Sequence, residues 1–316
     1  MKCVDRFVAC FVLFALSACN GNPNAPSPND ALIEAVSAGS LEDVKAAIEA
    51  GADPSATNDL SQPAIIIAAA RGDNAMIEYL IGKGADACAA DRNTGGTTIH
   101  HAMCSAYGSL RAMHGPLAAR LATMEVLLDH GADLEATDGE GLTPLSWTIL
   151  GQDIEAAKAL IERGASVEGA CRDGSLFHVA VGDRRADPGD LKKTLLFVSE
   201  LGADLNARNS EELTPLMYSL RNHNLEAARQ VAAMGADPDL EDDLGNRAIH
   251  KAAEWGDIEL ARLLVAAGAE LDELGFLGKT PLELARERDH AELAEFLEQA
   301  MGPKTPGDDD GSQSER

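Results

Sequence analysis

Residues 214–237 read TPLMYSLRNHNLEAARQVAAMGAD, and this stretch contains the signals that decide the fold. Thr214 is a natural helix cap, and Pro215 suits the first helical turn, where its missing N–H has no helical partner. Gly235 closes the stretch, because glycine adopts the left-handed conformation that ends a helix. The stretch therefore predicts a pair of short helices that stops at a glycine.

The closing signal recurs along the chain. The dipeptide Gly-Ala, usually followed by an acid, has intervals of 33, 47, 33, 38, 33 and 33 residues between its glycines, which are Gly51, Gly84, Gly131, Gly164, Gly202, Gly235 and Gly268. The opening signal recurs as Thr143-Pro144-Leu145 and Thr280-Pro281-Leu282, and in degenerate form at Pro63, Thr97, Ser175 and Arg247. Self-similarity at a fixed period indicates stacked units, because one helix pair cannot bury its apolar face alone.

Apolar residues in the second half of each unit recur at helical spacing. Examples are Ile77, Leu80 and Ile81, then Leu160 and Ile161, then Leu260, Leu263 and Leu264. We therefore expect leucines such as Leu160 and Leu263 to lie in the core.

The period, the Thr-Pro-Leu openings and the Gly-Ala stops resemble the ankyrin-repeat family. The resemblance covers Asp30 to about Met301 and implies an all-α solenoid of about eight helix pairs with short β-hairpin connections. The first pair, over 30–50, and the last, over 281–301, carry many charged residues and are predicted to be polar end caps. Residues 302–316 include prolines and three consecutive acids, which predicts a disordered acidic tail.

The composition favours helices and excludes one class of partner. Apolar residues make up 45% of the 316 residues but aromatic residues only 4%, whereas a β-protein requires more Val, Tyr, Phe and Trp. The formal net charge is −26, which repels a phosphate backbone, so we expect no nucleic-acid partner. Solubility explains most of this charge.

The N-terminus carries the pattern of an exported protein. Lys2 and Arg6 precede an apolar run over 7–16, which is too short for a membrane-spanning helix of about 20 residues. The run ends in Leu16-Ser17-Ala18-Cys19, which resembles the lipobox of bacterial lipoproteins. Residues 1–18 are therefore predicted to be a signal peptide that is removed.

The lipobox resemblance implies that Cys19 becomes the lipidated first residue of the mature chain. Several acyl chains together give a stable membrane anchor. Asn20, rather than Asp, follows the cysteine, which favours the periplasmic face of the outer membrane and leaves the inner membrane as the alternative. Residues 19–29 hold three prolines and almost no apolar side chain, so we expect a lipidated N-terminus followed by a flexible tether.

Candidate chemical sites are few. His100, His178 and His250 stand at the fourth position of the opening motif, where the ankyrin resemblance implies hydrogen bonds to the backbone of the neighbouring hairpin. His101 and His114 have no such explanation, but two histidines without Cys or acid at ligand spacing do not predict a metal site. The sequence has no nucleophile elbow, His-Glu-x-x-His motif or dinucleotide fingerprint. We therefore predict no enzyme activity, no metal and no cofactor.

Three cysteines remain once the signal peptide and the lipidation site are set aside: Cys88, Cys104 and Cys171. Cys88 and Cys104 lie in adjacent predicted repeats, so a disulfide between them stays open. We favour three thiols that are buried or partly buried.

Two predicted repeats exceed 33 residues. The longer insertion falls within 104–120 and includes Tyr107, Met113 and His114, and the shorter one lies near 182–190. Both are expected between the two helices of a repeat, where they leave the stack undisturbed. Insertions often map to the binding face of a repeat protein, and neutral change in a tolerant loop explains them equally well.

Ankyrin-repeat proteins, by the same resemblance, bind through hairpin tips and the exposed ends of first helices on the concave side of the stack. The predicted tips offer Asp59, Leu60, Glu140, Glu211, Asp243 and Phe276. The predicted helix ends offer Arg71, Arg221, Glu254, Trp255 and Arg288. Trp and Arg are favoured at interfaces, so Trp255 and Arg221 are expected side by side on one wall of the groove. On the simpler interpretation, each is an ordinary solvated side chain.

Together these features predict a lipid-anchored periplasmic module that binds a protein partner and is monomeric when free. One specific role is that of an immunity protein that neutralises a toxin effector such as a phospholipase, since the anchor places an inhibitor where such a toxin acts. The alternative is an accessory partner of a periplasmic enzyme such as catalase in oxidative-stress defence. A third hypothesis, from another class, is a hydrolase with its site in the insertion at 104–120.

Overall fold

A computed structural model describes residues 26–104, 116–168, 171, 173–183 and 186–302. These residues form sixteen α-helices in two compact units that divide after Glu140. The first unit contains α2 (Pro28–Ala38), α3 (Leu41–Glu49), α4 (Ala64–Arg71), α5 (Asn74–Gly82), α6 (Thr98–Met103) and α7 (Leu117–Asp129). The second contains α8 (Pro144–Leu150), α9 (Ile154–Glu162), α10 (Leu176–Gly182), α11 (Pro188–Glu200), α12 (Pro215–Arg221), α13 (Leu225–Ala233), α14 (Ala248–Trp255), α15 (Ile258–Ala266), α16 (Pro281–Glu287) and α17 (Ala291–Met301).

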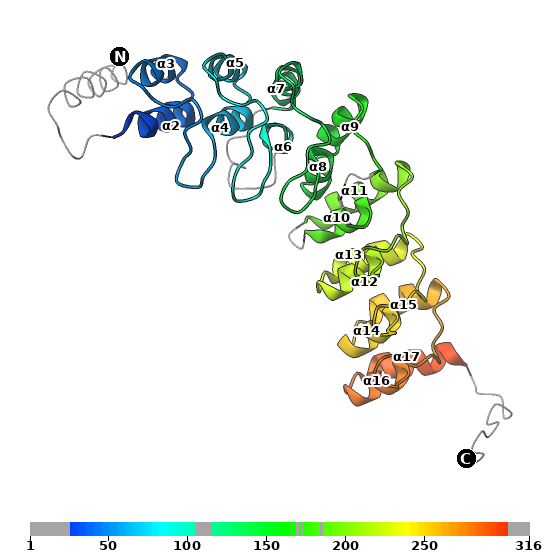
Figure 1. Cartoon of the computed structure of the whole chain (residues 1–316). Helices are drawn as coiled ribbons and strands as arrows, with labels where there is room; N and C mark the ends of the chain where they lie inside the picture. The colour runs from blue at the N-terminus through cyan, green and yellow to red at the C-terminus, as the bar shows by residue number, and fades with distance from the viewer. Residues whose placement is uncertain (1–25, 105–115, 169–170, 172, 184–185, 303–316) are drawn as a thin grey trace, which may run out of the picture. The chain divides into compact units, whose positions relative to one another are not determined.

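Each unit consists of helix pairs stacked in two layers (Figure 1). In the first unit, α2, α4 and α6 contact one another in turn and form one layer, while α3, α5 and α7 form the other. In the second unit, α8, α10, α12, α14 and α16 form the first-helix layer, and α11, α13, α15 and α17 follow one another in the second. The predicted all-α architecture of eight helix pairs is confirmed, with three pairs in the first unit and five in the second.

The first helices begin as the sequence predicts. The hydroxyls of Thr143, Thr214 and Thr280 accept hydrogen bonds from the N–H three residues on, at 3.4, 3.3 and 3.3 Å. The first helices form the inner layer. In α4, for example, every residue from Ala64 to Ala70 is at most 1% exposed. Alanines in this run allow neighbouring helices to approach closely.

Several second helices begin at an Asp or Asn cap, which the repeat motif does not mark. Asp73, Asp153, Asn224 and Asp257 each accept a hydrogen bond from the N–H three residues on, at 3.1, 3.1, 3.2 and 3.0 Å. Asp257 also pairs with Arg229 of the preceding α13 at 2.9 Å. The cap residues therefore start a helix and, in this case, also join it to the previous repeat.

One face of each second helix is buried against the first-helix layer. Leu160 in α9 and Leu260 and Leu264 in α15 are 0% exposed. Leu263 was predicted to lie in the core, but it is only partly buried. Leu264, four residues after Leu260, follows it along the inward face, whereas Leu263 lies at the flank of that face.

Seven of the eight helix pairs end near a glycine that the sequence marks. All seven stop glycines have positive φ, from 81° at Gly202 to 104° at Gly84. At Gly235 φ is 91°, and no atom lies within 4 Å of a Cβ built there. The backbone conformation, rather than a lack of space, therefore requires glycine.

The connections between pairs are tight turns that form no strands in the described residues. These connections, called hairpins below, run over 50–63, 83–97, 130–143, 163–175, 201–214, 234–247 and 267–280. Isolated antiparallel bridges join Thr57 to Pro63, Ala90 to Thr97 and Leu142 to Cys171. The predicted short hairpin connections are thus present, and single antiparallel bridges close those at 57–63 and 90–97, while side chains bond many of the other loop N–H groups.

The helical region begins earlier than predicted. The first described helix, α2, begins at Pro28, and Ser27 caps it by accepting a hydrogen bond from the Asp30 N–H at 3.2 Å. The predicted signal peptide, Cys19, most of the tether and nearly all of the acidic tail lie outside the described residues. Among the described helices, none has the length and apolar character needed to cross a membrane.

Both insertions fall between the two helices of a pair, as expected. The helix α6 ends at Met103 and α7 begins at Leu117, while α10 ends at Gly182 and α11 begins at Pro188. Residues 105–115 lie outside the described residues.

The cysteines differ in burial. Cys88 is an exposed free thiol whose Sγ donates to the Gly131 carbonyl at 3.3 Å, and Cys171 is a buried free thiol. Cys104 is buried. A disulfide between Cys88 and Cys104 is therefore not formed. The expectation of burial is wrong for Cys88, which is exposed on the hairpin over 83–97.

Candidate protein-binding surface

In five of the seven hairpins, the residue after Gly-Ala is an aspartate whose structural role explains the Gly-Ala-acid pattern. The carboxylate of Asp53 accepts a hydrogen bond from the Ser55 N–H at 2.8 Å. The equivalent bond, to the N–H two residues on, measures 2.8, 2.9, 2.9 and 3.0 Å at Asp86, Asp133, Asp204 and Asp237. A short carboxylate in this position closes an Asx turn. These acids therefore shape the hairpin.

A second Asp or Asn spans the tip of several hairpins. The Oδ1 atom of Asn58 accepts hydrogen bonds from the N–H groups of Leu60 and Gln62 at 3.0 and 2.9 Å. Asn209 and Asp242 make the same pair of bonds. Because these backbone groups are satisfied within the hairpin, the tip side chains are not needed to hold it together.

Neighbouring hairpins of the second unit are joined side by side. Asn206 Oδ1 accepts a hydrogen bond from the Asp237 N–H at 2.9 Å. One repeat later, Asp239 Oδ1 accepts from the Glu270 N–H at 2.9 Å. The same kind of contact therefore holds three successive hairpins in a row.

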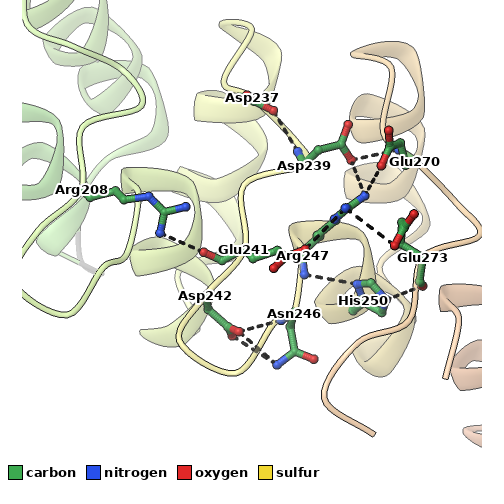
Figure 2. A network of polar contacts seen from close by, with 10 residues as sticks. All are labelled: Arg208, Asp237, Asp239, Glu241, Asp242, Asn246, Arg247, His250, Glu270 and Glu273. Atoms are coloured by element: carbon green, nitrogen blue, oxygen red, sulfur yellow. Dashed lines mark hydrogen bonds and ion pairs between the residues drawn. The ribbon is translucent and has the colours of Figure 1, made fainter. Parts of the chain in front are cut away.

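Arg247 gathers carboxylates from two of these hairpins (Figure 2). Its guanidinium lies 3.6, 3.4 and 3.9 Å from the carboxylates of Asp239, Glu241 and Glu273, and it also pairs with Glu270. Burial alone lowers the pKa of Arg247, but the bond to Glu270 and the surrounding negative charges outweigh it and raise this pKa. Its side chain is only 12% exposed, so Arg247 fixes one hairpin to the next rather than offering a free cation.

The motif histidines also join consecutive repeats. His178 Nε2 donates to the Leu213 carbonyl at 2.9 Å, and His250 Nε2 donates to the Glu273 carbonyl at 3.0 Å. Their Nδ1 atoms accept from the N–H of Ser175 and the N–H three residues before His250, at 3.1 and 3.2 Å. Burial lowers the pKa of both imidazoles. The predicted structural role is confirmed for these two histidines.

His101, for which the ankyrin pattern offers no role, forms a buried hydrogen-bonded pair with Asp91. Its Nε2 lies 2.7 Å from Asp91 Oδ2, and both side chains are 1% exposed. Asp91 also accepts hydrogen bonds from the N–H groups of Asn93 and Thr94 at 2.8 and 2.7 Å. Burial raises the pKa of Asp91, but the bonds from His101 and Thr94 outweigh it and hold this pKa well below its usual range. The pair therefore fixes its hairpin to α6.

The residues predicted to contact a partner fall into three groups. Those that are exposed at hairpin tips or helix ends are Asp59, Leu60, Glu140, Glu211, Arg221, Asp243, Phe276 and Arg288. Those that are partly buried are Arg71, Glu254 and Trp255. Those that lie outside the described residues are Tyr107, Met113 and His114.

The partly buried charged side chains contact residues of neighbouring repeats. Arg71 donates to the Ser37 carbonyl at 2.8 Å and covers Gly39, where a Cβ would lie 2.2 Å from the guanidinium. Glu254 pairs with Arg288 of the following repeat at 3.2 Å. These side chains contribute to the stack as well as to its surface.

Trp255 and Arg221 contact different residues. The Trp255 ring packs on the imidazole of His223 from the preceding repeat, with centroids 4.9 Å apart and planes at 41°. Arg221 pairs with Glu211 at the tip of its own repeat, at 2.9 Å. Trp255 was expected beside Arg221. It contacts His223 instead, two positions later in the sequence.

Besides Leu196 in α11, three exposed apolar residues on hairpins are not among those predicted from the sequence. Leu244, Leu274 and Leu277 are 48%, 61% and 55% exposed, and they join the predicted Phe276, which is 62% exposed. The only signal for them is a large apolar residue within an otherwise polar hairpin. Among the described residues, no group of three or more His, Cys, Asp or Glu side chains is arranged to hold a metal ion.

Comparison with known families decides what this arrangement is. A family model described as ankyrin repeats in three copies matches residues 32–114, 177–275 and 232–305. The chain belongs to the ankyrin-repeat family. Ankyrin repeats are typically protein-interaction scaffolds rather than catalytic domains, so this ankyrin protein is a protein-binding module.

Similar proteins share the ankyrin region over part of their length. The ankyrin repeat protein nuc-2 of Neurospora crassa is 26% identical over 253 residues, which are 70% of this chain and 22% of that protein. The putative palmitoyltransferase ZDHHC13 of Danio rerio is 32% identical over 71% of this chain and 32% of its own length. Protein PhlB of Serratia liquefaciens is 33% identical over 36% of this chain and 48% of its own length. The chain thus spans less than half of each.

A solved ankyrin structure supports the fold. The ankyrin repeat domain of human ASB11 matches with a TM-score of 0.55 and 22% sequence identity, over 76% of this chain and 99% of that domain. At this identity the likeness concerns the fold alone.

Proposed function

We propose that this ankyrin protein is a lipid-anchored periplasmic module that binds a toxin effector, such as a phospholipase, and neutralises it. The row of hairpins carries the binding role. Hydrogen bonds within each turn and between neighbouring hairpins are made by the backbone and by inner side chains. Glu211 and Phe276 remain exposed on this rigid support. A preorganised surface loses little conformational entropy when it binds a protein.

The anchor is supported by the lipobox Leu16-Ser17-Ala18-Cys19. Eight residues separate Cys19 from the first helix at Pro28. In a polyproline II conformation, at about 3.1 Å per residue, they would reach about 25 Å. This length holds the repeats close to the membrane, where an enzyme that attacks phospholipid acts. The immunity role is proposed on this placement.

Lipidation is tested with Cys19→Ala. The wild-type chain should incorporate labelled palmitate and be processed, whereas the variant should remain an unlabelled precursor in the same cells. Cys10→Ala, inside the predicted signal peptide, is the matched control and should be labelled normally. Labelling and normal processing of the Cys19→Ala chain would refute the anchor.

The binding role is tested by crosslinking in living cells. A photoreactive amino acid in place of Glu211, at a hairpin tip, should capture one protein, and the same group in place of Glu162, exposed on the second helix α9, should not. Mass spectrometry then identifies the captured protein. An exported phospholipase or other toxin supports immunity, a catalase supports the accessory role instead, and equal capture at both positions contradicts binding through the hairpins.

A further inference from the structure

The exposed apolar surface of this protein is concentrated on its last two hairpins. Six large apolar side chains are exposed among the described residues, and four of them lie on hairpins 234–247 and 267–280. We name these four the apolar tip patch: Leu244, Leu274, Phe276 and Leu277. Scattered exposed leucines are normal, but a cluster of large apolar side chains on adjacent loops marks an interaction site.

The two hairpins that carry the patch are fixed to each other. The Phe276 N–H donates to Asn246 Oδ1 at 3.1 Å. Gly275 allows this approach, because a Cβ there would lie 2.7 Å from the His250 ring and 2.9 Å from Asn246 Oδ1. Arg247 adds ion pairs to Glu270 and to other acids of both hairpins (Figure 2). The apolar tip patch is therefore presented on a preorganised support.

The surroundings of the patch are strongly acidic. Residues 237–247 and 270–280 hold eight acids and two bases, a net charge of −6. Both bases are engaged, since Arg247 is 12% exposed among its carboxylates and Lys279 pairs with Glu287. The side chains of Glu241, Glu270 and Glu273 remain 52%, 56% and 53% exposed. The large apolar side chains thus share their two hairpins with an excess of acids, which we name the acidic rim.

We propose that the apolar tip patch docks a segment of the partner protein in which large apolar side chains alternate with Lys or Arg. This inference rests on the proposed function and names the chemistry of the partner. Apolar side chains of the segment cover Leu274, Phe276 and Leu277, while its cations meet the acidic rim, which also speeds encounter.

Charge argues against the other occupants. A second copy that used the same patch would bring two rims of net charge −6 together. Residues 303–316 of this chain hold four acids and two bases, so they are also repelled. A cationic apolar segment of a different protein is the occupant that satisfies both the apolar centre and its rim.

The test uses the full-length purified chain in nonionic detergent and a fluorescent synthetic peptide of sequence KLKFLKLFK, with empty micelles as background. Fluorescence anisotropy should show binding to the wild type that weakens as salt is added. The double variant Phe276→Ser with Leu277→Ser should lose affinity about tenfold or more. Leu196→Ser, at an apolar residue of α11 that is 47% exposed, is the matched control and should bind as the wild type does.

Two further peptides separate the contributions. The acidic ELEFLELFE and the polar KSKSSKSSK should both bind at least about tenfold more weakly than KLKFLKLFK if charge and apolar contact act together. Equal binding of KSKSSKSSK, or an unchanged affinity of the double variant, would overturn the docking site. So would dimerisation of the wild type, measured by sedimentation, that the double variant abolishes.

The result is independent of the crosslinking experiment. If Glu211 captures a partner and the peptide does not distinguish the variants, the docking site fails and the proposed function stands. If the peptide distinguishes them and nothing is captured in cells, the chemistry of the patch stands and the proposed function fails.

Discussion

Leu264 should contribute several kcal/mol to stability, although its neighbour Leu263 looks equally apolar in the sequence. Leu264 is 0% exposed, so Leu264→Ala withdraws three carbon atoms from a packed layer. At about 0.8 kcal/mol for each, the lost transfer free energy is about 2.4 kcal/mol. The unfilled cavity adds about 0.5–2 kcal/mol, so the free energy of unfolding should fall by about 3–4 kcal/mol.

Leu263→Ala is the matched control, one residue away on the same helix. Leu263 is partly buried, so its truncation should cost only about 1 kcal/mol. Urea denaturation of the full chain, followed by far-UV circular dichroism, measures both variants, and the denaturant slope should stay constant if the compactness of both states is unchanged. Equal losses, or a larger loss for Leu263→Ala, would refute the assignment of the inward face of α15.

Two further changes test the backbone and the buried histidines. Gly235→Ala should lower the free energy of unfolding by about 1 kcal/mol, because φ at Gly235 is 91°. Gly82→Ala should raise it by about 0.5 kcal/mol, because φ at Gly82 is not positive and no atom obstructs a Cβ there. Changes of the same sign in the denaturation curves would contradict this role of φ. Burial lowers the pKa of His178 and His250, so the unfolded chain binds more protons than the folded chain does. The free energy of unfolding should therefore fall as pH drops below about 6.5, the pKa of histidine in the unfolded chain. Unfolding measured between pH about 7.5 and about 5 should depend less on pH in the double variant His178→Gln with His250→Gln, and an unchanged slope would count against the mechanism.

The repeat architecture was predictable from the sequence because its signals are local. A stop glycine such as Gly235 and a cap such as Thr214 act within one turn of backbone, and their spacing repeats. The position of Leu263 was predicted wrongly, since helical spacing identifies an apolar stripe but not which of two adjacent leucines follows its centre. The bonds inside the hairpins were not predictable from the repeat, because side chains such as Asn58 bond the backbone there and leave single bridges.

The candidate surface was predicted less completely, because contacts between repeats decide it. Exposed tip residues such as Glu211 and Phe276 follow from their position alone. The packing of Trp255 on His223 does not, since the ring reaches across to the preceding repeat. The burial of Arg247 among four carboxylates depends in the same way on residues from two hairpins. Spacing within one repeat carries no information on such pairs.

The turn bonds of the hairpins have a consequence for how this surface diverges. Asn58 and Asp242 close their turns through backbone N–H groups, which every residue except proline supplies. Substitution at an outward position such as Asp59 therefore leaves the turn intact, and mutations there are neutral for stability. Selection by a changing partner acts on these outward positions. Descendants of this gene are therefore expected to differ most at the hairpin tips, whereas the stop glycines and the helix caps persist.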